Sequence, residues 1–241
     1  MDDSIIEIFS SVQGEGKYIG MRQLFLRFPG CNIKCRFCDT DFSATSICHM
    51  EMIPGSGNFE ELPNPLSAEI IAANLNDMLA KAHHHSVSLT GGEPLLHADF
   101  IRALAPLLHA PLFLETNGTL YHEMKSVIDM ISYISMDIKL PSVTGKTLWS
   151  EHRRFLELVY RKDAYVKIVV AENTSNEEFL QAVHLMAESS PDTLLVLQPV
   201  TPFGGLTAPS AMKLLDFQAR ALDLLPEVRV IPQAHRMMGL L

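Results

Sequence analysis

The sequence lacks long apolar runs: none approaches the ~20 consecutive residues that a membrane-spanning helix needs. Its first residues, MDDSIIEIFSS, are acidic where a signal peptide carries positive charge, so we expect a cytoplasmic protein. Positive charge is also scarce, because 19 Lys and Arg stand against 28 Asp and Glu, which leaves a formal charge of −9. This balance argues against nucleic acid and membrane surfaces as partners.

Internal repeats and low-complexity tracts are absent as well, and 47% of the residues are hydrophobic, which is ample for one buried core. We therefore expect a single domain over residues 1–241. The one long stretch expected to be irregular is 43–65, which contains three Pro and two Gly residues. A loop of this length in a compact domain is usually functional or disordered.

Elsewhere, short β-branched and apolar runs alternate with amphipathic stretches. The expected strands cover 22–28, 86–90, 111–116, 133–140, 165–171, 194–200 and 228–233. The expected helices cover 67–82, 175–189 and 210–225, with a weaker one over 96–110 that Pro106 interrupts. Ser175 and Glu178 form a capping box at the start of the second of these helices. Strands that alternate with helices pair in parallel, so the sequence predicts an α/β fold, either a doubly wound sheet or a full or partial β/α barrel.

Polar residues at the ends of these strands favour the partial barrel. They are Thr90, Glu93, Glu115, Thr116, Asn117, Asp137, Lys139, Gln198, Gln233 and His235. In a β/α barrel the C-terminal ends of the strands meet at one face and build the active site. The alternation in SMDIK sends Ser135, Asp137 and Lys139 to one side of their strand. For this segment alone, an exposed edge strand with a salt bridge is an equal alternative.

Cysteine is scarce, yet three of the four cysteines lie within eight residues, in FPGCNIKCRFCDTDF (28–42). In a reducing compartment, Cys31, Cys35 and Cys38 are expected to bind metal or act in catalysis instead of forming disulfides. A zinc site needs further ligands at their own spacing, and the nearest candidates, Cys48 and His49, have no matching pair. Iron-sulfur clusters normally take four cysteines, so three leave one iron open to a substrate or cofactor.

This cysteine spacing, with Phe37 before the last cysteine and GGEP (91–94) after the second strand, resembles the radical S-adenosylmethionine (SAM) enzymes. More narrowly, six motifs are similar in sequence and order to the 7-carboxy-7-deazaguanine synthase family. They are SVQGEG (11–16), LFLRFPGCNIKCRFCDT (24–40), LTGGEPL (89–95), LETNGT (114–119), SMDIKLP (135–141) and PQAHR (232–236). The alternatives are a glycyl-radical activating enzyme, which lacks SVQGEG and the PQ-x-H tail, and a non-catalytic zinc or iron-sulfur binding module.

The resemblance implies a partial parallel β/α barrel with a 4Fe-4S cluster on Cys31, Cys35 and Cys38 in the loop after the first barrel strand. SAM is then expected to bind the open iron, and its radical to act on 6-carboxy-5,6,7,8-tetrahydropterin, which contracts and loses ammonia to give 7-carboxy-7-deazaguanine. This reaction belongs to 7-deazapurine (queuosine) biosynthesis. The resemblance also implies Mg²⁺ at Thr40, an electron donor such as flavodoxin or ferredoxin, and a homodimer.

Individual roles are carried over in the same way. The residues expected to bind SAM are Phe37, Gly91, Gly92, Glu93, Ser135, Asp137, Lys139 and Gln198. Those expected to bind the pterin are Gln13, Glu15, Arg27, Thr90, His235 and Leu241. Arg27 suits a carboxylate because its fork binds two oxygens at once. The carboxylate of Leu241, if it ends the chain, can accept two parallel N–H donors of a pterin ring.

The cysteine spacing yields a first testable prediction. Replacing any one of Cys31, Cys35 or Cys38 by Ala should abolish turnover, because each thiolate holds a different iron. Cys48→Ala should keep the iron content and the rate of the unmodified protein. Iron analysis and steady-state kinetics on the four variants check this, and loss of iron from Cys48→Ala would contradict the three-ligand interpretation.

Overall fold

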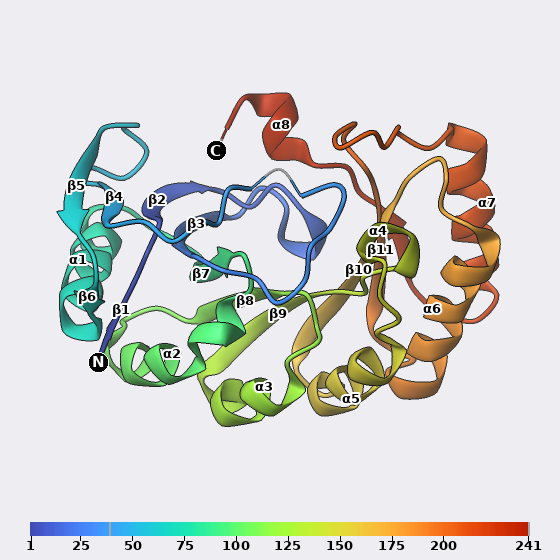
Figure 1. Cartoon of the computed structure of the whole chain (residues 1–241), viewed down its shortest axis with the longest axis horizontal. Helices are drawn as coiled ribbons and strands as arrows, with labels where there is room; N and C mark the ends of the chain where they lie inside the picture. The colour runs from blue at the N-terminus through green and yellow to red at the C-terminus, as the bar shows by residue number, and fades with distance from the viewer. Residues whose placement is uncertain (39, 241) are drawn as a thin grey trace.

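The computed structural model describes residues 1–38 and 40–240, and its centre is one ten-stranded sheet (Figure 1). The strand order is β12-β11-β10-β9-β8-β7-β3-β2-β4-β5. The run from β3 to β12 is parallel throughout. Its strands are β3 (Arg22–Phe28), β7 (Ser86–Gly91), β8 (Leu112–Thr116), β9 (Ile131–Asp137), β10 (Asp163–Val170), β11 (Leu194–Pro199) and β12 (Val228–Val230).

This run confirms the predicted partial β/α barrel, because β5 and β12 are edge strands and the sheet is not closed. Helices cover its outer side in Figure 1. They are α1 (Ala68–Lys81), α2 (Ala98–Leu104), α3 (Tyr121–Val127), α5 (Trp149–Val159), α6 (Asn176–Ser189) and α7 (Ala211–Leu222). In the described chain, no helix is both long and apolar enough to cross a bilayer.

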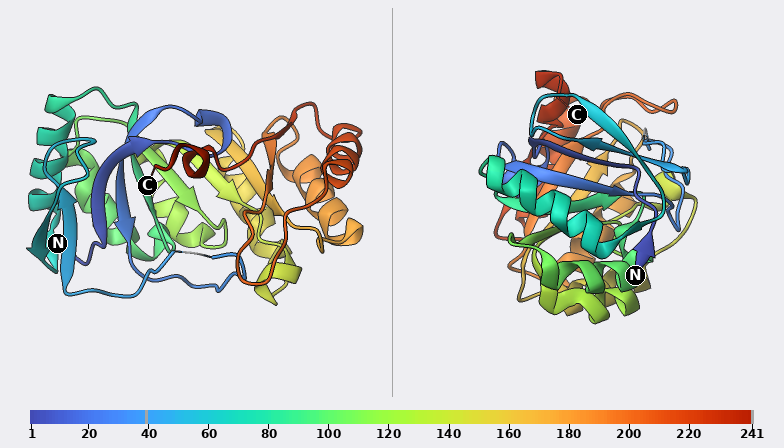
Figure 2. Two further views of the ribbon diagram at one scale, coloured as in Figure 1. Left: turned by 90° about the horizontal axis from the view of Figure 1, so that it is seen from above. Right: turned by 90° about the vertical axis from the view of Figure 1, so that its left-hand side faces the viewer.

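The opposite side carries the loops that follow the parallel strands, including α4 (Pro141–Thr144). Viewed from above, α8 (Ala234–Met238) lies across the ends of the strands, close to the N-terminal segment that follows β2 (Glu7–Val12) (Figure 2). The backbone bond from Ala234 N to Gly14 O, 2.8 Å long, joins these two segments. The first and last parts of the chain therefore enclose the same face of the sheet.

The prediction of an irregular segment over 43–65 was wrong, because this segment contains a β-hairpin. β4 (Ile47–Glu51) and β5 (Phe59–Pro63) pair antiparallel, and β4 adds to the sheet beside β2. Gly55 and Gly57, at φ +83° and +69°, lie in the turn between β4 and β5, where a positive φ favours glycine. The Glu51 carboxylate accepts hydrogen bonds from Gly57 N at 2.7 Å and Ser10 N at 2.9 Å, which holds the hairpin to β2.

The predicted helices are confirmed with small changes at their ends. Ser175 and Glu178 form the expected reciprocal capping box of α6, and Ser67 caps α1 through Ile70 N. The helix predicted over 96–110 ends at Leu104, and a 3-10 turn (Ala105–Leu107) accommodates Pro106. The sequence interpretation missed β2, α3, α5 and α8, as well as the short antiparallel pair β1 (Asp2–Asp3) and β6 (Leu66–Ser67).

Candidate active site

A cavity of about 630 Å³ opens at the C-terminal ends of the parallel strands and collects most of the predicted site residues. Those assigned to SAM that line it are Phe37, Gly91, Gly92, Ser135, Asp137, Lys139 and Gln198. The three clustered cysteines, Thr40 and the predicted pterin ligands Gln13, Glu15, Arg27, Thr90 and His235 line it as well. Glu93 is not among the lining residues, and Leu241 lies outside the described residues.

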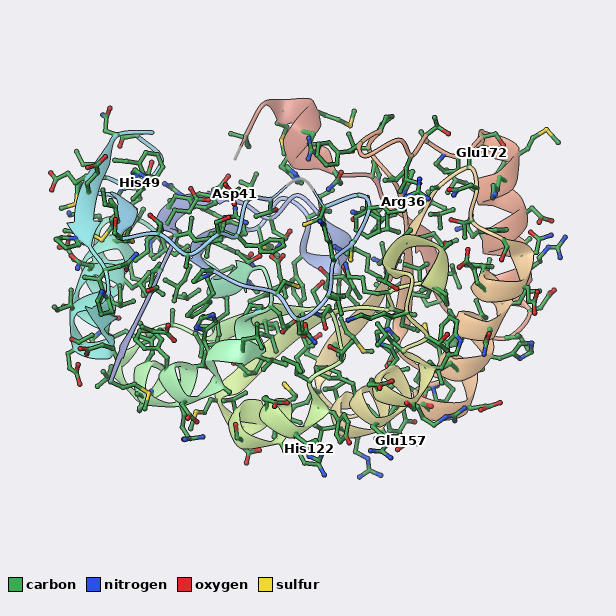
Figure 3. All side chains as sticks on the ribbon, viewed as in Figure 1. Arg36, Asp41, His49, His122, Glu157 and Glu172 are labelled. Atoms are coloured by element: carbon green, nitrogen blue, oxygen red, sulfur yellow. The ribbon has the colours of Figure 1, made fainter. Side chains whose placement is uncertain are left out.

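The cavity lies on the loop side of the molecule. In Figure 3, Arg36 and Asp41 extend from the cysteine loop on this side, whereas His122 and Glu157 project from the outer helices on the far side. The backbone of the loop is fixed by Gly30 N to Phe42 O at 2.8 Å and Arg36 N to Val143 O at 3.0 Å. The loop that follows β3 is therefore tied both to itself and to α4.

The three cysteines of this loop are free, partly buried thiols. Burial raises the pKa of Cys31 and of Cys35, and the Lys139 ammonium acts in the opposite direction on both. Among the described residues, no three His, Cys, Asp or Glu side chains converge on one point as ligands of a single ion. A 4Fe-4S cluster does not require such convergence, because each cysteine binds a different iron. The donor set therefore fits the cluster better than it fits mononuclear zinc.

Gly91 and Gly92 form the turn that follows β7, and the space of their missing side chains is filled by the backbone of the segment before the cysteines. A Cβ on Gly91, at φ +124°, would lie 2.2 Å from Phe28 O. On Gly92 it would lie 1.7 Å from Gly30 O. The resemblance assigns both glycines to SAM, and the structure adds a second requirement, because neither position has room for a side chain while the cysteine loop packs against this turn.

Glu93 is fully buried behind the same turn. Its carboxylate accepts hydrogen bonds from Thr116 Oγ1 at 2.8 Å, Asn117 N at 2.7 Å and Leu95 N at 3.1 Å. Burial raises the pKa of Glu93 to about 7, against the effect of these donors. Glu93 thus joins the turns after β7 and β8, and its contacts in this structure are with protein groups.

Asp137 and Lys139 follow one another along the end of β9 and pair across the cavity wall, with Oδ2 and Nζ 2.5 Å apart. The Lys139 ammonium also lies 5.0 Å from the centre of the Phe37 ring, which connects the cysteine loop to this strand end. The strand predicted over 133–140 ends earlier in the structure. Strand β9 ends at Asp137, so Lys139 lies just beyond it.

His152 holds the backbone beside Lys139, a role that the sequence interpretation missed. Lys139 N donates to its Nε2 at 3.1 Å, so Nδ1 carries the proton and donates to Gly118 O at 3.1 Å. Burial lowers the pKa of His152 to about 4, so the ring stays neutral at physiological pH. The loops that follow β8 and β9 are thereby held together.

Lys167 was also missed, although it lines the cavity. Its ammonium binds Glu15 and lies 3.4 Å from Asp137 Oδ1. Burial raises the pKa of Glu15, but the Lys167 charge and hydrogen bonds from Lys167 and Gln233 outweigh this and lower it to about 2. One signal was available in the sequence. YVKIVVA contains a lone lysine in an otherwise apolar, β-branched strand, and SMDIK, on the neighbouring strand, contains charged residues in the same way.

Glu15 also orients two amides. Gln198 Nε2 donates to its Oε1 at 3.2 Å, and Gln233 Nε2 donates to the same oxygen at 2.7 Å. A carboxylate only accepts, so both amide groups must turn their NH₂ toward it. Gln233 Oε1 then accepts from Thr201 Oγ1 at 2.5 Å, whereas Gln198 Oε1 is buried without a partner among the described residues. Within the described chain, Gln198 Oε1 is therefore an unpaired buried acceptor on a residue that lines the cavity.

Glu115, on β8, accepts hydrogen bonds from two residues of β7 and from the segment that follows β2. It accepts from Gln13 Nε2 at 2.9 Å, Ser88 Oγ at 3.1 Å and Thr90 Oγ1 at 3.2 Å. The sequence grouped Glu115 with the strand-end residues but gave it no role. Thr90 and Gln13, both expected at the pterin, are held by this one carboxylate.

Two further predicted ligands, one on β3 and one on α8, also line the cavity. Arg27 Nε binds Glu7 Oε1 at 2.6 Å, and its guanidinium lies over the Phe9 ring. His235, on α8, packs so closely on Gly14 that a Cβ there would lie 2.1 Å from its Nδ1. Glycine at position 14 is therefore required for α8 to close over the segment before Glu15.

Comparison with known proteins places the chain among characterised relatives. Residues 25–202 match the Radical SAM superfamily. A 7-carboxy-7-deazaguanine synthase of Geobacter sulfurreducens is 44% identical over 239 residues, covering 97% of this chain and 96% of that protein. Another, of Methanocaldococcus jannaschii, is 35% identical over 253 residues, covering 98% and 100%. The crystal structure of QueE from Escherichia coli shares the fold, with a TM-score of 0.62, 20% identity and coverage of 98% of this chain and 95% of that one.

The packing of Gly92 predicts a defect in the cysteine loop. Gly92→Ala should lower the free energy of unfolding by about 1–3 kcal/mol and reduce iron incorporation, because its Cβ would displace Gly30 and lies 3.2 Å from Cys31 Cβ. The control is Gly145→Ala, which is strained at φ +69° but has no neighbour within 4 Å. The control should cost about 1 kcal/mol and keep its iron. Equal iron contents in the two reconstituted variants would refute this account.

The ion pair of Glu15 predicts a dependence of stability on pH. Its pKa in the folded chain, about 2, lies below the ordinary value of 4.5, so the ionised form stabilises the fold. This contribution should be complete above pH 4.5 and disappear as the pH falls toward 2. The difference in unfolding free energy between the unmodified protein and Glu15→Gln should therefore shrink across that window in denaturant titrations. A constant difference would show that Lys167 does not control this carboxylate.

Proposed function

We propose a function from one premise: the chain belongs to the radical SAM superfamily and, within it, to the 7-carboxy-7-deazaguanine synthases. It is a radical SAM enzyme that converts 6-carboxy-5,6,7,8-tetrahydropterin to 7-carboxy-7-deazaguanine with loss of ammonia, in 7-deazapurine (queuosine) biosynthesis. The observation that carries this conclusion is the single cavity that joins three cysteine thiols to two distinct sets of polar groups.

One set serves the cofactor. Cys31, Cys35 and Cys38 would hold the 4Fe-4S cluster, which together with SAM supplies a carbon radical able to take a hydrogen atom from the substrate. The paired Asp137 and Lys139 suit the ribose hydroxyls and the carboxylate of SAM, with Ser135 beside them on β9. The remaining residues proposed at SAM are Phe37, Gly91, Gly92 and Gln198.

Gln198 is proposed at the adenine because it lines the cavity and its Oε1 has no hydrogen-bond partner among the described residues. Glu93 enters the proposal with a changed role. Its carboxylate is buried among protein donors, so it would fix the turn that carries Gly91 and Gly92 without itself binding SAM.

The other set serves the substrate, with Gln13, Glu15, Arg27, Thr90 and His235 as its members. Arg27 contacts Glu7 through Nε, so its two terminal nitrogens can bind the pterin carboxylate in parallel. Glu15, kept ionised by Lys167, is a suitable acceptor for the N–H groups of the pterin ring. Both residues line the same cavity, and Lys167 places Glu15 near Asp137 at the end of β9.

Several further points belong to the proposal. An electron donor such as flavodoxin or ferredoxin would supply the electron, two chains would form a homodimer, and residues 1–241 would act as one domain. The free thiols of all four cysteines support a reducing compartment such as the cytoplasm.

Anaerobic turnover of the reconstituted enzyme with SAM, a reductant and the tetrahydropterin tests this function. We expect 7-carboxy-7-deazaguanine and ammonia in equal amounts, measured by chromatography and an ammonia assay. Reductive cleavage of SAM without either product would overturn the assigned substrate while leaving the radical SAM chemistry in place. A glycyl-radical activating enzyme would instead form a stable radical on a partner protein.

Magnesium is proposed at Thr40, which lines the cavity beside the cysteine loop. One hydroxyl binds Mg²⁺ weakly, so substrate and water oxygens must complete the site. Removing magnesium should therefore slow turnover, and Thr40→Ala should weaken this dependence while cleavage of SAM persists. The measurement is a magnesium titration of both forms, and identical curves would exclude a role for Thr40 in binding the ion.

A further inference from the structure

We propose that Lys167 is the shared counter-ion of the two halves of the site, and that it couples the binding of SAM to the binding of the pterin. This inference rests on the proposed function, because that function assigns Asp137 to SAM and Glu15 to the substrate. Lys167 is a positioning residue in this role, because it acts through the two carboxylates that it binds.

The position of Lys167 follows from the sheet. In the parallel pairing of β10 with β9, Lys167 is opposite Asp137, and its side chain is only 9% exposed. Two residues earlier on the same face, Tyr165 fills the space of the missing side chain of Gly16, where a Cβ would lie 2.1 Å from the ring. Tyr165 and Lys167 together hold the segment around Glu15 against β10, so the ammonium meets a carboxylate 152 residues away in sequence.

The two carboxylates depend on Lys167 to different degrees. Asp137 has a second cation, Lys139, at 2.5 Å. Glu15 has the amides of Gln198 and Gln233, which are neutral donors, and His235 close enough to lower its pKa. Loss of Lys167 therefore leaves Glu15 with a less complete set of partners than Asp137. We therefore expect loss of Lys167 to lower the affinity for the pterin more than the affinity for SAM.

Coupling follows because both carboxylates bind the same ammonium. A ligand that donates hydrogen bonds to one carboxylate weakens the attraction of that carboxylate for Lys167. The ammonium can then bind the other carboxylate more strongly, which changes how well the other carboxylate accepts hydrogen bonds from its own ligand. Linkage makes such an effect reciprocal. Changes on the SAM side should therefore alter affinity for the pterin, and changes on the pterin side should alter affinity for SAM.

The chain contains a matched control. Lys17 binds Asp163 at 2.6 Å and joins the same two segments, the one around Glu15 and strand β10, but both side chains are about 40% exposed. If Lys167 only tethered these segments, Lys17→Met should have a comparable effect. If instead the buried charge of Lys167 couples the two carboxylates, Lys17→Met should leave the affinities for SAM and for the pterin unchanged.

The experiment measures the affinities of SAM and of the tetrahydropterin by anaerobic calorimetry on the reconstituted enzyme, without turnover. Lys167→Met should weaken pterin binding at least about tenfold and SAM binding about threefold. Lys167→Arg, which keeps the charge, should restore both to within about threefold of the unmodified enzyme. Unchanged affinities in a folded Lys167→Met variant, or an equal loss in Lys17→Met, would overturn the proposal.

Cross-effects give a second measurement that does not require Lys167→Met to fold. Asp137→Asn should change affinity for the pterin, and Glu15→Gln affinity for SAM, each by about threefold or more. The absence of both effects would also overturn the coupling. An unmodified enzyme that binds SAM but not the pterin would instead refute the proposed function. The comparison of SAM affinity between Lys167→Met and Lys17→Met would still test Lys167, because Glu15→Gln also removes the direct bond from Gln198 to Glu15.

Discussion

The structure of the site depends on one constraint: charged groups removed from water must be paired. Glu15, Asp137, Lys139 and Lys167 meet at the ends of β9 and β10, where an unpaired charge would be costly. Each of them is held by another member of the set, and the uncharged amides of Gln198 and Gln233 complete the shell of Glu15. The positions of the proposed SAM and pterin ligands are therefore not independent, because a shift of one charge requires the others to follow.

Close backbone packing supplies the second constraint. Three glycines allow the walls of the cavity to approach one another: Gly92 against Gly30, Gly16 against Tyr165, and Gly14 against His235. In each case the space of a single methyl group is already filled by another segment. The motifs GGEP and SVQGEG thus fix where the cysteine loop, strand β10 and α8 lie relative to one another. Catalytic geometry of this kind is built on rigid elements instead of mobile loops.

Much of this arrangement could be predicted from local sequence. Strand β3 was predicted at its observed ends, 22–28, and the Ser175 capping box is present, because both depend on patterns within a few residues. The hairpin of β4 and β5 could not be found in this way, since its Gly and Pro residues resemble a loop and its pairing with β2 is non-local.

The same limit applies to the site. Its lining residues could be named from motifs, whereas Lys167 and His152 act through partners far away in sequence, which a single motif does not reveal. Glu93 shows the converse. A familiar motif suggested a ligand contact, but burial and three protein donors give this side chain a structural role.

The bonds of Glu15 also determine when the cavity can close during folding. Its partners lie 152, 183 and 218 residues away along the chain, at Lys167, Gln198 and Gln233. The start of the cysteine loop rests on the pairing of β3 with β7, within the first 91 residues, and the loop is then held further along the chain by Val143 of α4. Contacts of such long separation form late, because the entropy of closing the intervening loops must be overcome first. The wall around Glu15 therefore closes only when strands β10 and β11 and the segment before α8 are in place, so the cavity is completed late in folding.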